Sequence, residues 1–176
     1  AINPNKYFIV SINMFGNGFS SSPNNTIKSQ SGSKFPTLTL WDNIYCQYKL
    51  ITEKLKIKEI ALVTGWSMAG CQSYQWAAQY PNMVKAILPF CASSKTSIHN
   101  HVFLEGVKAA LTADKNWNKG NYKKQPVAGL RAFGRVYAGW AFSQNFYREK
   151  LFKKIGYTNS EELLNDWAED HAKNWD

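Results

Sequence analysis

The first half of the chain alternates short apolar runs with segments that carry a helical pattern. The apolar runs lie at residues 6–12, 59–64 and 84–91. Each is rich in β-branched and aromatic side chains, as buried strands are. Between them, apolar residues recur every three or four positions over residues 40–55, which predicts a helix. Residues 68–80 have the composition of a second helix, which is expected to end before Pro81. This order of strands and helices predicts an α/β fold with a parallel sheet and crossover helices.

The first helix has a recognisable start. Residues 13–37 are rich in Gly, Ser, Asn and Pro and predict a long loop. Thr39 follows it, and Asp42 stands three residues later, which is the spacing of a capping box with the shorter acid. We therefore expect a helix that begins directly after Thr39.

The second half of the chain contains no further strand run after Cys91. Helices are expected at residues 101–111 and 131–154, and a last helix, capped by Ser160, through Trp167. The sequence thus predicts two domains, an α/β core at residues 1–97 and a helical lid or cap at residues 98–176.

Composition excludes several classes of protein. With 44% hydrophobic and 19% charged residues the chain can form a core, and no apolar stretch approaches the roughly 20 residues of a membrane span. Three cysteines without C-x-x-C pairing indicate reduced thiols, no metal site and a cytoplasmic protein. The net charge of +9 would attract anions, but the lysines are scattered and no nucleic-acid-binding motif is present. We expect neither a nucleic acid nor a membrane as partner.

The most informative motif is Gly65-Trp66-Ser67-Met68-Ala69-Gly70, between a strand and a helix. A serine on such a turn projects its Oγ above the sheet edge, which is the arrangement of a nucleophile elbow. Small residues are needed because strand and helix nearly touch there, and the backbone N–H of Met68 would be an oxyanion donor. The fifth position is Ala69 where the usual pattern has Gly. The alternative is that Ser67 is only a helix N-cap.

Motifs along nearly the whole chain resemble the α/β-hydrolase superfamily, and within it the homoserine O-acetyltransferase-like family. The matching segments are Asn13–Gly18, Phe35-Pro36 with Thr39 and Asp42, Gly65–Met68, Tyr80-Pro81, Phe103–Glu105, Ala113-Asp114, Trp117, Gly129-Leu130 and Gly134-Arg135. The resemblance implies an eight-stranded sheet with a helical lid, of which this chain would be the central part. It also implies acyl transfer through an acyl-serine at Ser67, with acyl-CoA as a candidate co-substrate and no bound cofactor.

The resemblance also suggests residues that bind substrate. Arg135 would fall near the lid arginine that holds the acceptor's carboxylate, the alternative being a surface arginine. Trp66 stands where the acetyltransferases usually have Gly, and Ser20–Pro23 replaces their Gly-Ser-Thr-Gly-Pro stretch. These two departures point to a different acyl acceptor, which could be water, and make an ester hydrolase of the same fold the alternative function.

The base and acid of a catalytic triad are not evident. His99 and His101 match the family as lid residues, and Asp166 and His171 on one helix would point about 140° apart. We therefore expect a complementary chain or a homo-oligomer as partner, besides a small acyl donor and acceptor. Two other hypotheses remain: a non-catalytic half-fold binding protein and a polyanion binder driven by charge.

Overall fold

The structure, a computed structural model, describes residues 2–16 and 19–175. The chain divides into two units, which are treated separately below. The sheet unit comprises Ala1–Ser22 and Pro36–Lys95, and the helical unit comprises Pro23–Phe35 and Thr96–Asp176. The sheet unit contains α1 (Leu40–Lys49), β1 (Val63–Trp66), α2 (Met68–Gln79) and β2 (Ile87–Phe90). The helical unit contains α3 (Ile98–Thr112), α4 (Val127–Ala141), α5 (Gln144–Arg148) and α6 (Ser160–Asn174).

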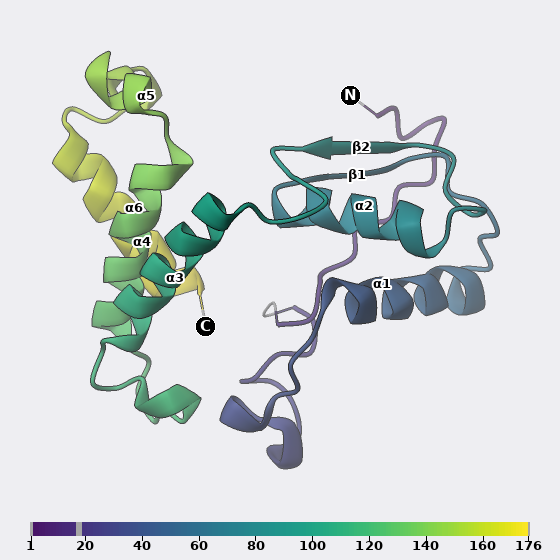
Figure 1. Cartoon of the computed structure of the whole chain (residues 1–176), viewed down its shortest axis with the longest axis horizontal. Helices are drawn as coiled ribbons and strands as arrows, with labels where there is room; N and C mark the ends of the chain where they lie inside the picture. The colour runs from purple at the N-terminus through teal and green to yellow at the C-terminus, as the bar shows by residue number, and fades with distance from the viewer. Residues whose placement is uncertain (1, 17–18, 176) are drawn as a thin grey trace. The chain divides into compact units, whose positions relative to one another are not determined.

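The two strands pair in parallel, with α2 as the crossover helix between them. The register joins Thr64 to Leu88 and Trp66 to Phe90, and a single bridge joins Ile60 to Val84. Helices α1 and α2 lie on the same side of the strands, with α2 directly against them (Figure 1). The buried core of this unit consists of Ile44, Ile51, Trp76 and Met83. The parallel α/β arrangement expected from the sequence is confirmed.

Helix α1 starts at the expected capping box. The Oγ1 of Thr39 accepts a hydrogen bond from the N–H of Asp42, and the N–H of Thr39 donates to Asp42 Oδ2 at 2.8 Å. The hydrogen bond from the Thr39 hydroxyl is the main reason that the pKa of Asp42 is lowered. The helix continues as a π-helical turn over Leu50–Lys54, and Lys56 then leaves it with a left-handed φ of 57°.

Two of the three expected strands form, and one does not. The second appears later than expected, as Val63–Trp66, and the third lies within its expected range, as Ile87–Phe90. The expected strand at residues 6–12 is wrong for this structure, because no described segment pairs with it. Residues 8–14 have no assigned secondary structure, and residues 2–11 are all exposed. An apolar sequence alone does not make a strand, since the backbone also needs a partner to bond.

In the helical unit, α4 packs against both α3 and α6. The single helix expected at residues 131–154 is wrong, because Phe142 is extended (φ −109°, ψ 143°) and Ser143 caps the new helix α5. Lys150 then adopts a left-handed conformation before the 3₁₀ turn Leu151–Ile155. Helix α3 begins at Ile98, three residues before the expected start, with Ser97 as its cap.

The last helix has a different cap from the expected one. The side chain of Asn159, not Ser160, accepts a hydrogen bond from the N–H of Glu162 at 2.9 Å. Helix α6 also runs past Trp167 to Asn174. Asn and Ser cap helices about equally well, so sequence preference could not choose between these neighbours.

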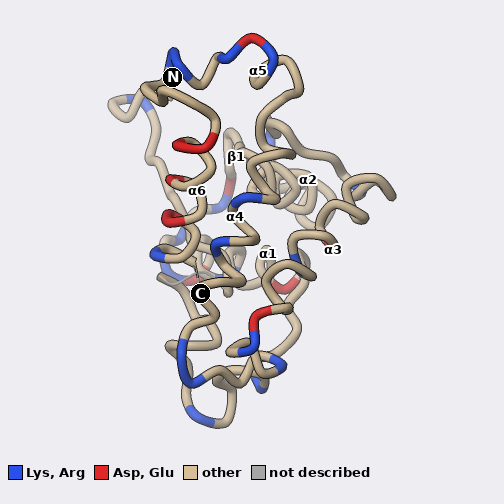
Figure 2. The backbone as a smooth tube through the Cα atoms, turned by 90° about the vertical axis from the view of Figure 1, so that its left-hand side faces the viewer, with Lys and Arg blue, Asp and Glu red and all other residues tan. Residues whose placement is uncertain are grey.

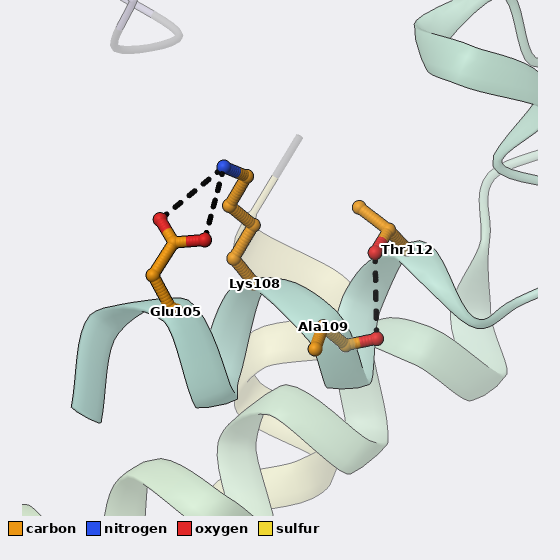
Figure 3. Close-up of polar contacts among 4 residues, drawn as sticks. All are labelled: Glu105, Lys108, Ala109 and Thr112. Atoms are coloured by element: carbon orange, nitrogen blue, oxygen red, sulfur yellow. Dashed lines mark hydrogen bonds and ion pairs between the residues drawn. The ribbon is translucent and has the colours of Figure 1, made fainter. Parts of the chain in front are cut away.

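Charged residues lie mainly on exposed surfaces. Lys and Arg positions are spread over many elements, whereas acidic positions follow one another along α6 (Figure 2). On α3, Lys108 donates to both carboxylate oxygens of Glu105, and the Thr112 hydroxyl donates to the carbonyl of Ala109 (Figure 3). Exposed ion pairs of this kind contribute about 0–1 kcal/mol, so packing of apolar faces holds the unit together. None of the described helices combines the length and apolar character needed to span a membrane.

Candidate functional site

Ser67 occupies the turn between β1 and α2. Its backbone has φ 53° and ψ −117°, a combination that residues with a Cβ atom rarely adopt. Its N–H donates to the carbonyl of Phe90 at 2.9 Å, and its own carbonyl accepts from the N–H of Cys71 at 3.0 Å. The end of β2 and the first turn of α2 therefore hold this residue from both sides.

The side chain of Ser67 is exposed. It forms no capping hydrogen bond with α2, and no other described residue bonds its Oγ. The alternative interpretation, that Ser67 serves as a side-chain N-cap, therefore does not apply to this geometry. A hydroxyl held on a strained turn with nothing to bond is accessible to a substrate.

Small residues allow strand and helix to approach closely at this turn. A Cβ atom added to Gly65 would lie 2.5 Å from both the carbonyl carbon and the Cβ of Ala69. A Cβ added to Gly70 would lie 2.5 Å from the Cβ of Ala92. Real Cβ atoms cannot come this near to other atoms, so glycine is required at both positions. Ala69, where the usual pattern has a fifth-position Gly, fits without displacing the helix start.

The neighbours of Ser67 are a helix start and two exposed apolar side chains. Met68 is the first residue of α2, where backbone N–H groups lack acceptors within the helix and favour negative charge. Trp66 is 70% exposed and Met68 is 54% exposed, one on each side of the serine in sequence. A negatively charged oxygen near Ser67 would have a backbone N–H as hydrogen-bond donor and two apolar side chains as neighbours.

Arg135 lies on α4 in the helical unit, where its guanidinium is already engaged. One nitrogen donates to Asn165 Oδ1 at 2.8 Å and another to Glu161 Oε1 at 2.7 Å, both on α6. The side chain is 38% exposed. These two bonds use part of the guanidinium that would otherwise bind the carboxylate of an acyl acceptor. They are the contacts expected under the alternative, in which Arg135 is a structural arginine on the surface.

Among the residues that the structure describes, the histidines of the helical unit form no histidine–carboxylate pair. His171 is buried, and its Nδ1 lies 2.7 Å from the carbonyl oxygen of Trp167. Asp166 instead accepts a hydrogen bond from the hydroxyl of Tyr157 at 2.6 Å, and this bond raises the pKa of Tyr157. His99 is exposed and contacts Trp140 with the two rings tilted by 53° and 4.8 Å between their centroids. In the described part of the chain, no three His, Cys, Asp or Glu side chains form a group suited to a metal ion.

A buried asparagine that the sequence reasoning missed anchors the loop after residue 12. The Oδ1 of Asn43 accepts from the N–H of Phe15 at 2.8 Å, and its Nδ2 donates to the carbonyl of Thr39. Asn43 directly precedes the core residue Ile44. A polar residue next to the regularly spaced apolar residues of α1 was the sequence feature that could have indicated its buried role. Asn17 and Gly18, which belong to a segment that resembles the family, lie outside the described residues.

Comparison with known proteins identifies the family of this chain. A family model described as alpha/beta hydrolase fold matches residues 1–172. A probable esterase of Corynebacterium glutamicum is 33% identical over 172 residues, covering 96% of this chain and 49% of the relative. An ethyl acetate hydrolase of Pseudomonas veronii is 34% identical, covering 89% of this chain and 46% of the relative. A homoserine O-acetyltransferase of Methanohalobium evestigatum is 35% identical, covering 74% of this chain and 28% of the relative.

A solved structure agrees with these matches. The crystal structure of an acetylester hydrolase from Corynebacterium glutamicum superposes with a TM-score of 0.94 and 32% identity, covering 99% of this chain and 51% of that one. The chain thus spans about half the length of the esterases it matches. The resemblance to the homoserine O-acetyltransferase-like family is confirmed, with esterases among the relatives. The chain belongs to the alpha/beta hydrolase fold family.

Proposed function

We propose that Ser67 is the nucleophile of an ester-cleaving enzyme and forms an acyl-serine intermediate. The observation that supports this most is the exposed hydroxyl on a strained strand–turn–helix bend, free of any hydrogen bond from the described residues. The serine oxygen would attack the ester carbonyl and release the alcohol. The N–H of Met68 would stabilise the oxyanion, because it is the first N–H of α2 and lacks an acceptor in the helix.

We favour water as the acceptor of the acyl group. Arg135 already donates to Glu161 and Asn165, which competes with a role in holding the carboxylate of an amino-acid acceptor. Trp66 adds a large exposed ring beside the nucleophile, at a position where the resemblance leads one to expect Gly. The names of two relatives, ethyl acetate hydrolase and acetylester hydrolase, suggest short acetyl esters as substrates.

Acyl transfer to a small hydroxyl compound is the second candidate. It draws support from the homoserine O-acetyltransferases among the relatives, and acyl-CoA would then be the donor. Assays with acetyl-CoA as the donor, in the presence and absence of homoserine, separate the two functions. Formation of acetylhomoserine that Arg135→Lys selectively reduces would favour transfer. Release of acetate at a rate that homoserine does not change would favour hydrolysis.

We propose that the general base comes from outside the residues described. Within the helical unit, His171 bonds the backbone and Asp166 bonds Tyr157, so neither is set up to orient the other. An unassisted serine hydroxyl is a weak nucleophile. We therefore expect the chain alone to turn over very slowly and to need a histidine from another polypeptide segment.

A fluorophosphonate probe tests the nucleophile directly. The probe should label Ser67 slowly, because no base assists it in this chain, with the site identified by peptide mass spectrometry, and Ser67→Ala should abolish labelling. Ser94→Ala, at an exposed serine of the sheet unit, serves as the matched control and should label normally. Labelling that persists in Ser67→Ala would contradict the proposal and favour a non-catalytic binding protein. A loss of DNA affinity with rising salt would instead support the polyanion binder.

A further inference from the structure

A groove lies at the end of the sheet unit where the two strands begin. Its volume is about 550 Å³, within the roughly 300–1,000 Å³ range of small-molecule sites. Helices α1 and α2 both end on this side of the unit (Figure 1). The groove lining includes Tyr48, Lys56, Ile57, Lys58, Tyr80 and Met83. Ser67 precedes α2 and Tyr80 follows it, and a helix of 12 residues is about 18 Å long, so the groove is separate from the candidate active site.

One wall of the groove is aromatic. The rings of Tyr48 and Tyr80 stack with 4.0 Å between their centroids and 8° between their planes. Tyr80 also contacts Trp76 of the buried core, with 5.6 Å between ring centroids, which fixes the wall to the core. Ile57 and Met83 add apolar side chains to the lining. The wall therefore offers a flat, preformed surface on which the ring of a ligand can pack.

Lys56 and Lys58 give the groove a positive charge. Both side chains are exposed. Among the residues that the structure describes, no carboxylate lines the groove and neither lysine forms an ion pair. By contrast, the nearby Lys49 is paired with Glu53 at 2.6 Å. Two uncompensated ammonium groups beside an aromatic wall favour a ligand that is both anionic and planar.

Lys56 also adopts a backbone conformation that suits glycine better. Its φ is 57°, where it ends the π-helical turn. The N–H of Leu55, before it, donates to the carbonyl of Leu50, and the N–H of Ile57, after it, donates to the carbonyl of Ile51. Glycine is the usual left-handed residue at a helix end because it has no Cβ atom. A lysine at this position is unfavourable for the fold, which supports a role for its ammonium group in binding.

We propose that this groove binds a small organic anion with a planar aromatic body, of the class of aromatic carboxylates. The ring of the ligand packs against Tyr48 and Tyr80, and its carboxylate pairs with the ammonium groups of Lys56 and Lys58. An inorganic anion would leave the aromatic wall unused, and an uncharged ring would leave both ammonium groups unpaired. The site is additional to Ser67 and does not depend on an acyl-serine.

The test uses the full 176-residue chain and naphthoate as the probe, because naphthoate is planar, apolar and negatively charged. In a titration followed by nuclear magnetic resonance, the amide signals of Tyr80 and Met83 should shift, and those of α4 should not. Naphthol carries the ring without the charge at neutral pH, and acetate carries the charge without the ring. Each should bind at least about tenfold more weakly than naphthoate.

Substitutions of lysines locate the site. Lys56→Gln and Lys58→Gln should each weaken naphthoate binding by about three- to fivefold. Lys56→Gly should weaken binding as much as Lys56→Gln does, yet raise the melting temperature by about 2–4 °C, because glycine relieves the left-handed backbone. The matched control is Lys54→Gln, since Lys54 is exposed in the same π-helical turn but lies outside the groove lining. It should leave the dissociation constant unchanged.

Three results would overturn the proposal. They are no shift of the groove signals by naphthoate, equally tight binding of acetate or naphthol, or an equal loss of binding with Lys54→Gln, which would indicate attraction by net charge alone. Ser67→Ala should bind naphthoate as well as the unsubstituted chain does. Failure of the proposed function would therefore leave this measurement unaffected.

Discussion

The main-chain N–H of Ser67 donates to the carbonyl oxygen of Phe90 at 2.9 Å, which ties the residue after β1 to the last residue of β2. This bond lies at the carboxyl end of both parallel strands. It holds Ser67 in place at the start of α2, even though a φ of 53° is unfavourable for a residue with a side chain. The sheet therefore maintains the strained backbone of Ser67. Replacing the side chain that causes the strain should measurably change the free energy of unfolding.

Ser67→Gly should stabilise the fold by about 1 kcal/mol, because glycine adopts positive φ without the steric cost of a Cβ atom. Ser67→Ala keeps the Cβ and should change the free energy of unfolding by less than about 0.5 kcal/mol. Urea denaturation followed by circular dichroism measures both. Ser94→Gly, at a residue without positive φ, should instead destabilise. Equal losses for the two glycine substitutions would show that Ser67 is not strained.

Features set by neighbouring residues could be predicted from the sequence. The capping box of Thr39 and Asp42 needs only a spacing of three, and the bend at Ser67 needs only a strand, small residues and a helix in succession. Residues 6–12 have the composition of a strand, but a strand also depends on a partner that composition does not reveal. The break at Phe142 was hidden by the apolar pattern on both sides of it.

The residues of the candidate site also differ in whether the sequence alone could predict their positions. Ser67 and Met68 could be placed from the local motif. The bonds of Arg135 to Glu161 and Asn165 could not, because these residues lie 26 and 30 positions further along the chain and meet Arg135 only when α4 packs on α6. The buried role of Asn43 likewise depends on the loop that passes it.

Gly134→Ala should destabilise the helical unit by about 1–3 kcal/mol. An added Cβ would lie 2.7 Å from the carbonyl oxygen of Trp167 and 3.0 Å from Nδ1 of His171, so α4 and α6 would have to separate. Gly139→Ala on the same helix is the control, because nothing lies within 4 Å of its added Cβ. It should stabilise by up to about 1 kcal/mol through helix propensity. Thermal unfolding distinguishes the two, and similar effects would contradict the close packing of α4 on α6.

His171→Ala should lower stability but leave Ser67 chemistry intact. The ring is buried and contacts Phe133 and Trp175, with centroid distances of 5.5 and 5.0 Å, so its loss should cost about 2–4 kcal/mol. Asp166→Asn, which can still accept from Tyr157, should cost far less. Fluorophosphonate labelling of Ser67, measured at a temperature where both variants are folded, should be unchanged. Loss of labelling in both variants would instead mark them as a catalytic pair.

Asp114→Asn should make the helical unit less sensitive to acid. The Asp114 carboxylate accepts from the N–H of Asn116 at 2.8 Å and from that of Gly129 at 2.9 Å, joining the end of α3 to the start of α4. These hydrogen bonds, with that of Asn116 first, lower the pKa of Asp114 from its ordinary value of 3.8. Because the folded-state pKa is lowered, the stabilisation is complete above pH 3.8 and is lost as the pH falls through the lowered value.

The difference in melting temperature between the unsubstituted chain and Asp114→Asn should therefore be constant near neutral pH and shrink below about pH 4. Thr112→Ala is the matched control, because its hydroxyl only donates to the carbonyl of Ala109 and does not titrate in this range. Its melting-temperature difference should stay the same at every pH. If the Asp114→Asn difference also stayed constant on acidification, the two amide bonds could not be specific to the ionised carboxylate.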